Sequence, residues 1–115
     1  MAKYERSFQR DFHDFLETLN EELENSSLSV SCEDSSDITM GNIKVAVRVY
    51  ERYSMAGGNR VSLNVTVVGN ENDIIVSAIT SGGSQAVFFK INTWGEESFL
   101  EVCSDVVEKY IARQR

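Results

Sequence analysis

A glycine-rich turn late in the sequence offers the backbone geometry that small-anion binding needs. It consists of five consecutive residues, Ser81, Gly82, Gly83, Ser84 and Gln85. Successive amides and two hydroxyls in such a turn can converge on a phosphate or a carboxylate. The turn matches neither the Walker pattern nor the dinucleotide fingerprint, and a strand rather than a helix is expected after it. Glycines between two strands are also explained by backbone conformation alone, so both interpretations stay open.

Basic side chains recur in the middle of the sequence, on either side of an earlier glycine-rich turn. Lys44, Arg48 and Arg52 alternate with apolar residues, which predicts a position on the outward face of a sheet. Arg60 is expected near the end of the hairpin. With Tyr50 among them, the set could bind a nucleotide, an RNA strand or an acidic peptide, but cross-strand charge pairs on a solvated face also explain it. The net charge of −7 disfavours nucleic acid and anionic membranes as partners.

The single histidine and the two cysteines are the remaining residues with reactive side chains. His13 could act with Asp14 or Glu17 as a general base or a metal ligand. One histidine makes no histidine-rich metal site, and Cys32 and Cys103 lack the paired spacing of zinc ligands. Both cysteines fall on apolar faces, which favours reduced thiols in the core. No catalytic residue, no metal site and no cofactor is predicted.

The elements that must position these residues follow from the period of the apolar positions. Spacings of three and four predict an amphipathic helix over residues 7–24, with Phe8 and Phe12 on its apolar face. Thr93 and Glu96 form a capping-box pattern, which predicts the start of a second helix. Between the helices, alternating apolar and polar positions predict strands. Five strands are expected, at residues 28–32, 43–50, 61–67, 74–80 and 86–91.

The predicted fold is a single α+β domain over residues 1–115. It contains an antiparallel sheet of about five strands in a meander, flanked in sequence by an N-terminal and a C-terminal helix that pack on one face. The hydrophobic fraction of 42% and the charged fraction of 25% are ordinary for a globular domain. No apolar run approaches the ~20 residues that span a bilayer, and no signal peptide is evident, so a cytoplasmic protein is expected.

The two faces of the predicted sheet receive different side chains. The inner face, beneath the helices, is expected to hold Ile43, Val45, Val47, Val49, Val61, Leu63, Val65 and Val67. Other apolar side chains are then left on the helix-free face, namely Tyr50, Val68, Ile79 and Phe88. An uncovered apolar patch of this kind usually marks an interaction site. A homo-oligomer, most simply a dimer, would cover it.

Four stretches of the sequence carry a family resemblance. They are VRVYERYS at residues 47–54, GGNRVSL at 57–63, SAITSGGSQAVFFK at 77–90 and NTWGEE at 92–97. Together they resemble a family of small bacterial proteins catalogued only as a domain of unknown function, over residues 45–100. The resemblance implies a stand-alone bacterial cytosolic protein. It implies no substrate, cofactor or catalytic residue.

The sequence therefore leaves the function unknown but favours one class. We favour a non-enzymatic binding or interaction module that self-associates and holds a small anionic ligand. The alternative is a small enzyme that acts on a phosphorylated or carboxylated metabolite, between the turn at residues 81–85 and the basic face of the sheet.

Overall fold

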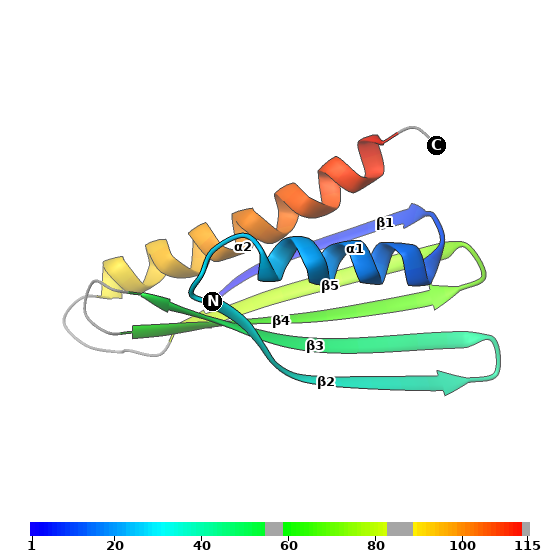
Figure 1. Ribbon diagram of the computed structural model, residues 1–115, viewed down its shortest axis with the longest axis horizontal. Coiled ribbons are helices and arrows are strands. Elements are labelled where there is room, and N and C mark those ends of the chain that lie inside the picture. The colour runs from blue at the N-terminus through cyan, green and yellow to red at the C-terminus, as the bar shows by residue number, and fades with distance from the viewer. Residues whose placement is uncertain (55–58, 83–88, 114–115) are drawn as a thin grey trace.

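The computed structural model describes residues 1–54, 59–82 and 89–113, and it contains two helices and a five-stranded sheet (Figure 1). In chain order the elements are β1 (Ala2–Gln9), α1 (Phe12–Glu24), β2 (Val30–Met40), β3 (Ile43–Ser54), β4 (Asn59–Asn70), β5 (Asp73–Gly82) and α2 (Phe89–Ala112). The strands lie in the order β1-β5-β4-β3-β2, and all neighbours are antiparallel. The predicted α+β class with a five-stranded antiparallel sheet is confirmed.

The N-terminal residues form a strand rather than the start of a helix. The predicted helix over residues 7–24 is correct only from residue 12, because residues 2–9 pair with β5 as β1. Asp11 ends the connection and caps α1, its carboxylate accepting a first-turn amide at 2.9 Å. Phe8 still packs on Phe15 of the helix, with ring centroids 4.9 Å apart. The strand therefore places Phe8 in the same apolar cluster that helical spacing predicts.

The C-terminal helix starts earlier than predicted. Phe89–Ala112 is helical, so the strand expected at residues 86–91 is wrong in its last three positions, and its first three lie outside the described residues. Thr93 lies inside the helix instead of at its cap. The predicted capping box is therefore absent, and the buried Glu96 carboxylate accepts the Gly82 amide at 2.5 Å instead. The fifth strand of the sheet is β1.

The strand β2 is longer than the predicted segment 28–32, because the acidic stretch that follows also pairs with β3. The register shifts between Cys32 and Asp34, which is a bulge on an edge strand. A two-residue turn then reverses the chain, with Gly41 at a φ of +60°. That angle favours glycine at the first position of a tight hairpin turn.

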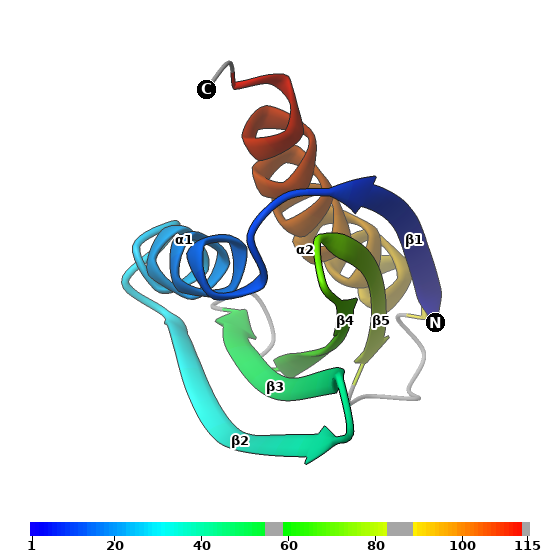
Figure 2. The same ribbon diagram turned by 90° about the vertical axis from the view of Figure 1, so that its right-hand side faces the viewer.

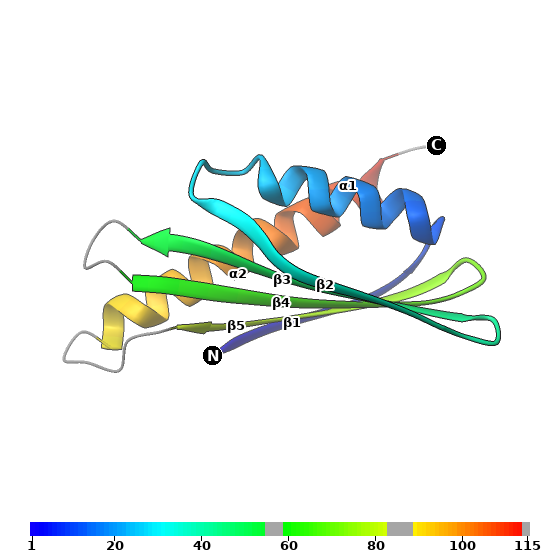
Figure 3. The ribbon, with the colours of Figure 1, turned by 60° about the horizontal axis from the view of Figure 1, so that its bottom comes forward.

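Both helices lie on the concave side of a curled sheet (Figures 2 and 3). The core between them and the sheet contains fully buried side chains from every layer, including Phe15, Leu19, Tyr50, Leu63, Val65, Val76, Phe99 and Cys103. The opposite face of the sheet carries no helix in the described residues. Within those residues, neither helix has the length and apolar content that crossing a membrane would require.

The inner face predicted for the sheet is correct in β4 and wrong in β3. Val61, Leu63, Val65 and Val67 are buried beneath the helices as expected. In β3 the buried side chains are Ala46 and Tyr50, whereas the set from Ile43 to Val49 lies on the helix-free face. The cause is the register, because Tyr50 stands opposite Leu63 and directly opposed residues share a face.

Candidate functional site

The helix-free side of the sheet is an apolar surface, here called the apolar sheet face. Five of the seven large hydrophobic side chains that are exposed in the described residues lie on it, namely Ile38, Met40, Tyr53, Ile75 and Ile79. Half-buried side chains extend it, namely Ile43, Val45, Val47, Val49 and Val68. Strand pairing sets four members in one row across four strands, in the order Ile75, Val68, Val45 and Ile38. A row of this length is a continuous surface rather than scattered exposed residues.

The residues predicted for an interface divide between the two sides of the sheet. Val68 and Ile79 lie on the apolar sheet face, as expected. Tyr50 does not, because it is fully buried beneath α1, where its hydroxyl donates to the Asn20 side-chain oxygen at 2.8 Å. Phe88 lies outside the described residues.

The three arginines predicted to bind a ligand also divide between the two sides. Arg60 lies on the apolar sheet face and forms an ion pair with Glu51 at 2.6 Å. Arg48 and Arg52 instead lie on the helix side of β3, contrary to the predicted outward position. The Arg52 guanidinium is 4.8 Å from the centre of the Phe99 ring, and burial lowers its pKa. The three side chains therefore form no single site.

The glycine-rich turn is described only in part. Ser81 and Gly82 end β5, whereas Gly83, Ser84 and Gln85 lie outside the described residues. The Gly82 amide already donates to the Glu96 carboxylate, and the Met1 amine lies 2.7 Å from the same carboxylate. At this end of the turn, a carboxylate of the protein itself occupies the amide.

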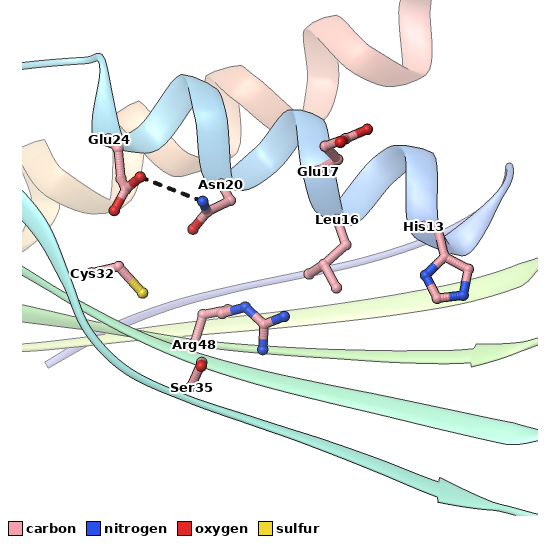
Figure 4. Close-up of a pocket in the computed structure, with 8 residues that line it drawn as sticks. All are labelled: His13, Leu16, Glu17, Asn20, Glu24, Cys32, Ser35 and Arg48. Carbon is pink, nitrogen blue, oxygen red and sulfur yellow. Dashed lines mark hydrogen bonds between the residues drawn. The ribbon is translucent and has the colours of Figure 1, made fainter.

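A groove, here called the α1 groove, separates α1 from β2 and β3. One hollow of about 490 Å³ is lined by His13, Leu16, Glu17, Asn20, Glu24, Cys32, Ser35 and Arg48 (Figure 4). A smaller hollow of about 250 Å³ shares His13, Leu16 and Arg48 and adds Asp37 and Lys44. The groove arises because β2 and β3 present polar and charged side chains toward α1, and these side chains cannot pack as a dry core.

Arg48 projects from β3 toward α1, as Figure 4 shows. Its side chain is 13% exposed and lies 3.0 Å from the carboxylate of Asp37, which is 68% exposed. It also donates to the Val47 carbonyl at 3.0 Å. A largely covered guanidinium that is held in place in this way is suited to bind a carboxylate or a phosphate through two parallel hydrogen bonds.

His13 and Lys44 meet at the end of the groove near the β2–β3 turn. The Lys44 ammonium is 3.3 Å from His13 Nε2, and it donates when that nitrogen carries no proton. His13 follows Phe12, whose ring covers Gly69 of β4 so closely that a side chain at Gly69 would overlap it. The glycine therefore lets the first turn of α1 rest on the sheet, and this fixes the position of His13.

The other end of the groove is acidic. Glu24 ends α1 and accepts a hydrogen bond from the Asn20 amide at 3.4 Å. The pKa of the half-buried Cys32 thiol is raised, first by burial and then by the negative charge of Glu24, whereas Arg48 lowers it. Glu24 and Arg48 therefore have opposite effects on the pKa of Cys32, because their charges are opposite. The groove thus has an acidic part and a basic part.

Most of the groove is not predicted from the sequence. His13 is predicted to act with Asp14 or Glu17, but Asp14 accepts the Tyr110 hydroxyl at 2.6 Å, and Lys44 lies 3.3 Å from His13. The sequence does contain one signal for the groove, the alternation of basic residues along β3. This alternation shows that the basic residues share one face of the sheet, but it does not show which face the helices cover. Among the described residues, no group of three histidine, cysteine or acidic side chains is placed to hold a metal ion.

Comparisons with known proteins give the family but no function. Neither the curated proteins nor the solved structures contain a significant match to this chain. A family described as a family of unknown function (DUF6054) matches residues 1–111. The chain therefore belongs to the DUF6054 family of unknown function.

Proposed function

We propose that this chain is a non-enzymatic cytosolic binding module that holds a small anionic ligand in the α1 groove. The observation that carries the proposal is Arg48, a guanidinium that is 13% exposed and points into a hollow of about 490 Å³. A hollow of that size falls within the usual range for small-molecule sites, about 300–1,000 Å³. The proposed site differs from the glycine-rich turn, which the sequence left open as an anion site.

The neighbours of Arg48 support an anion rather than a neutral ligand. Lys44 and His13 line the adjoining hollow, which Arg48 also lines, so three nitrogen-bearing side chains face one region. The carboxylate that pairs with Arg48 belongs to Asp37 and is mostly exposed. Because Asp37 can return to solvent, a ligand carboxylate can take its place beside the guanidinium.

The chemistry of the groove favours binding over catalysis. The Cys32 thiol lines the hollow together with Arg48, and burial raises its pKa. A thiol reacts as the thiolate, so a raised pKa makes it less reactive at neutral pH. The Cys32 thiol instead donates to the Asp34 carbonyl, 3.7 Å away.

A pair of arginine variants tests the proposal. We expect butyrate or butyl phosphate to raise the melting temperature of the native protein, because a ligand bound only to the folded state stabilises it, by about 2.7 kcal/mol at a hundredfold excess over Kd. Arg48→Gln should abolish this shift. Arg60→Gln makes the same charge change on the opposite face and should preserve it. An unchanged shift in Arg48→Gln would place the ligand elsewhere.

A second candidate function, self-association, is favoured by the row of apolar side chains across the apolar sheet face. Fully burying one side chain such as Ile75 contributes roughly 1.5–3 kcal/mol, so covering the row would stabilise a dimer. The rim of this face carries both signs of charge, with Lys3 and Glu5 from β1 on its side of the sheet. A rim of mixed charge is complementary to itself under a two-fold axis, which favours a second copy as the partner.

The edge of β2 makes edge-to-edge pairing less favourable than stacking through this face. The strand carries a bulge between Cys32 and Asp34 and a run of exposed acidic residues, both of which oppose the addition of another strand. Light scattering after size exclusion should give twice the chain mass. Ile75→Asp should convert the protein to a folded monomer, whereas Leu28→Asp, at an exposed site in the α1–β2 connection, should leave the dimer intact. A native monomer at micromolar concentration would refute the idea.

A further inference from the structure

We infer that the ligand of the α1 groove is a small zwitterion, with an amine and a carboxylate joined by a short carbon chain. The inference rests on the proposed function and adds to it the second charge of the ligand. It starts from the charges that line the groove, which are of both signs and come from different elements. Arg48 comes from β3, and Glu24 comes from the last turn of α1.

The C-terminal end of α1 is short of positive charge. Its last turn holds Glu21, Glu22 and Glu24 and contains no basic residue. The carbonyl end of a helix carries a partial negative charge, so carboxylates there raise the free energy and a cation lowers it. Glu22 is paired with Arg113 at 2.8 Å, so α2 already supplies a cation to one of the three. A ligand ammonium at Glu24 would supply another from the groove side.

Glu24 is also placed to receive a donor. Figure 4 shows its side chain on the groove side of α1, beside Asn20 and above Cys32. Its contact with the Asn20 amide is long, at 3.4 Å, and leaves room on the carboxylate for stronger donors. An ammonium has three donors and is the natural partner of such a carboxylate.

Asn20 from α1 and the Cys32 thiol from β2 lie between Glu24 and Arg48, whereas Leu16 lies beyond Arg48, toward His13 (Figure 4). Methylene groups between the amine and the carboxylate of a ligand would lie against the Cys32 side chain. A purely anionic ligand would gain nothing from Glu24 and would be repelled by it. The charge pattern therefore selects an amino acid-like molecule over a simple carboxylate.

The test compares ligands that differ only in the amine. Isothermal titration would measure a series of ω-amino acids from glycine to ε-aminohexanoate, each beside the carboxylate of the same length without its amine. We expect at least one amino acid of the series to bind about tenfold or more tightly than its partner carboxylate, because charge-assisted hydrogen bonds are the strong ones. The plain carboxylate itself should bind measurably.

Two variants separate this inference from the proposed function. Glu24→Gln should reduce the affinity for the amino acid to about that for the plain carboxylate. The plain carboxylate should bind this variant at least as tightly as it binds the native protein, because the repulsion by Glu24 is gone. Glu21→Gln removes a charge from the same turn, outside the residues that line the hollow, and should preserve the tenfold difference. Arg48→Gln should weaken both ligands.

The possible results separate a failure of the zwitterion inference from a failure of the anion site. If plain carboxylates bind as tightly as every amino acid, or if Glu24→Gln leaves the amino acid affinity unchanged, the zwitterion is wrong and the anion site stands. If no carboxylate or amino acid of the series binds, or if Arg48→Gln changes nothing, the zwitterion and the proposed site are both wrong.

Discussion

The two halves of the helix-covered face differ in what fills them. Where β5 and β4 lie beneath α2, the inward positions are mostly apolar, and Ile74, Val76 and Ala78 are each at most 1% exposed. Where β3 and β2 lie beneath α1, the inward positions include Lys44 and Arg48, and the α1 groove opens there. One continuous sheet thus has a dry half that holds the fold together and a wet half that is available for binding.

Hydrogen bonds from the N-terminal segment to α2 further stabilise the dry half. On β1, the Tyr4 hydroxyl and the Arg6 guanidinium both donate to the Glu108 carboxylate of α2, the latter at 2.9 Å. These hydrogen bonds, the one from Arg6 first, hold the pKa of Glu108 below its usual value. Arg10 donates to the Ile111 carbonyl at 2.5 Å and so satisfies the end of α2. Removal of groove residues should therefore cost little stability.

Each half of the helix-covered face contains one cysteine. The largest expected effect is the difference between the alkylation rates of these two thiols. Cys103 belongs to α2 and is fully buried, and burial raises the pKa of its thiol to about 12. For a domain stable by at least about 5 kcal/mol, a core thiol becomes accessible only through unfolding, which slows its alkylation by more than about a thousandfold. Cys32 is half-buried beside the groove and should react far faster. Peptide mapping after iodoacetamide treatment would measure both rates.

A ligand in the α1 groove should slow the alkylation of Cys32 without changing that of Cys103. Cys32→Ser provides the control, since it should leave one slow thiol. Equal native labelling rates for the two cysteines would show that the wet half is as closed as the dry half.

Gly69→Ala should cause the next largest change, because it acts where α1 meets the sheet. A methyl group at Gly69 would overlap the Phe12 ring, and overpacking of this kind costs roughly 1–3 kcal/mol. Urea denaturation would measure the loss. Phe12→Leu should cost less in the Gly69→Ala background than alone, because the smaller side chain relieves the overlap. Additive losses would show that the ring does not depend on the glycine.

Tyr110 joins α2 to α1 and should make the stability of the folded protein fall at alkaline pH. Burial, and then its hydrogen bond to Asp14 of α1, raises its pKa to about 12, against about 10 in an unfolded chain. The folded state therefore favours the protonated phenol. This contribution is complete below about pH 10 and is lost as the pH rises through about 12.

Urea denaturation of Tyr110→Phe at neutral and alkaline pH tests this link. The variant should lose about 1 kcal/mol at neutral pH, as one hydrogen bond is removed, and should lose less stability than the native protein at higher pH. Tyr53→Phe, on the apolar sheet face, is the matched control for the loss at neutral pH and should cost less there, because the Tyr53 side chain is 50% exposed. Parallel slopes for Tyr110→Phe and the native protein would contradict the assignment.

Glu71→Gly should give the smallest change in the free energy of unfolding, and it should raise stability. Glu71 lies in the β4–β5 turn at the edge of the groove with a φ of +58°, which is unfavourable for a residue with a side chain. Glycine removes that strain but adds freedom to the unfolded chain, for a net gain of roughly 0.5–1 kcal/mol. Asn72→Gly, at the neighbouring position without a positive φ, should give no gain.

The fold class could be predicted from the sequence because the apolar periods are strong, but the faces of β3 could not. Both sets of alternate residues in β3 contain apolar side chains, so the pattern alone does not choose between Val49 and Tyr50. The choice depends on the register with β4, which pairs Ser54 with Asn59, so that even positions of β3 face the same way as odd positions of β4. A shift of one residue reverses every side chain.

The strand β1 was hidden for a different reason. Tyr4 and Phe8 are four residues apart, and Phe8 and Phe12 repeat that spacing, so helical and strand periods overlap. Only the partner strand β5, far away in the sequence, decides between them. The groove residues Asp37 and Glu24 likewise give no local signal, since the side chains that face them come from other elements.

The pairing of β1 with β5 also bears on the order in which the chain folds. The hydroxyl of Thr80 donates to the Ala2 carbonyl across 78 positions of sequence, whereas β2, β3, β4 and β5 join through short connections. Closing a long loop costs more entropy than forming local hairpins, so the hairpins have the kinetic advantage. During synthesis β1 leaves the ribosome long before β5, so β1 has no partner strand until β5 has been made. Until the two strands pair, the part of the sheet on which α2 packs is incomplete.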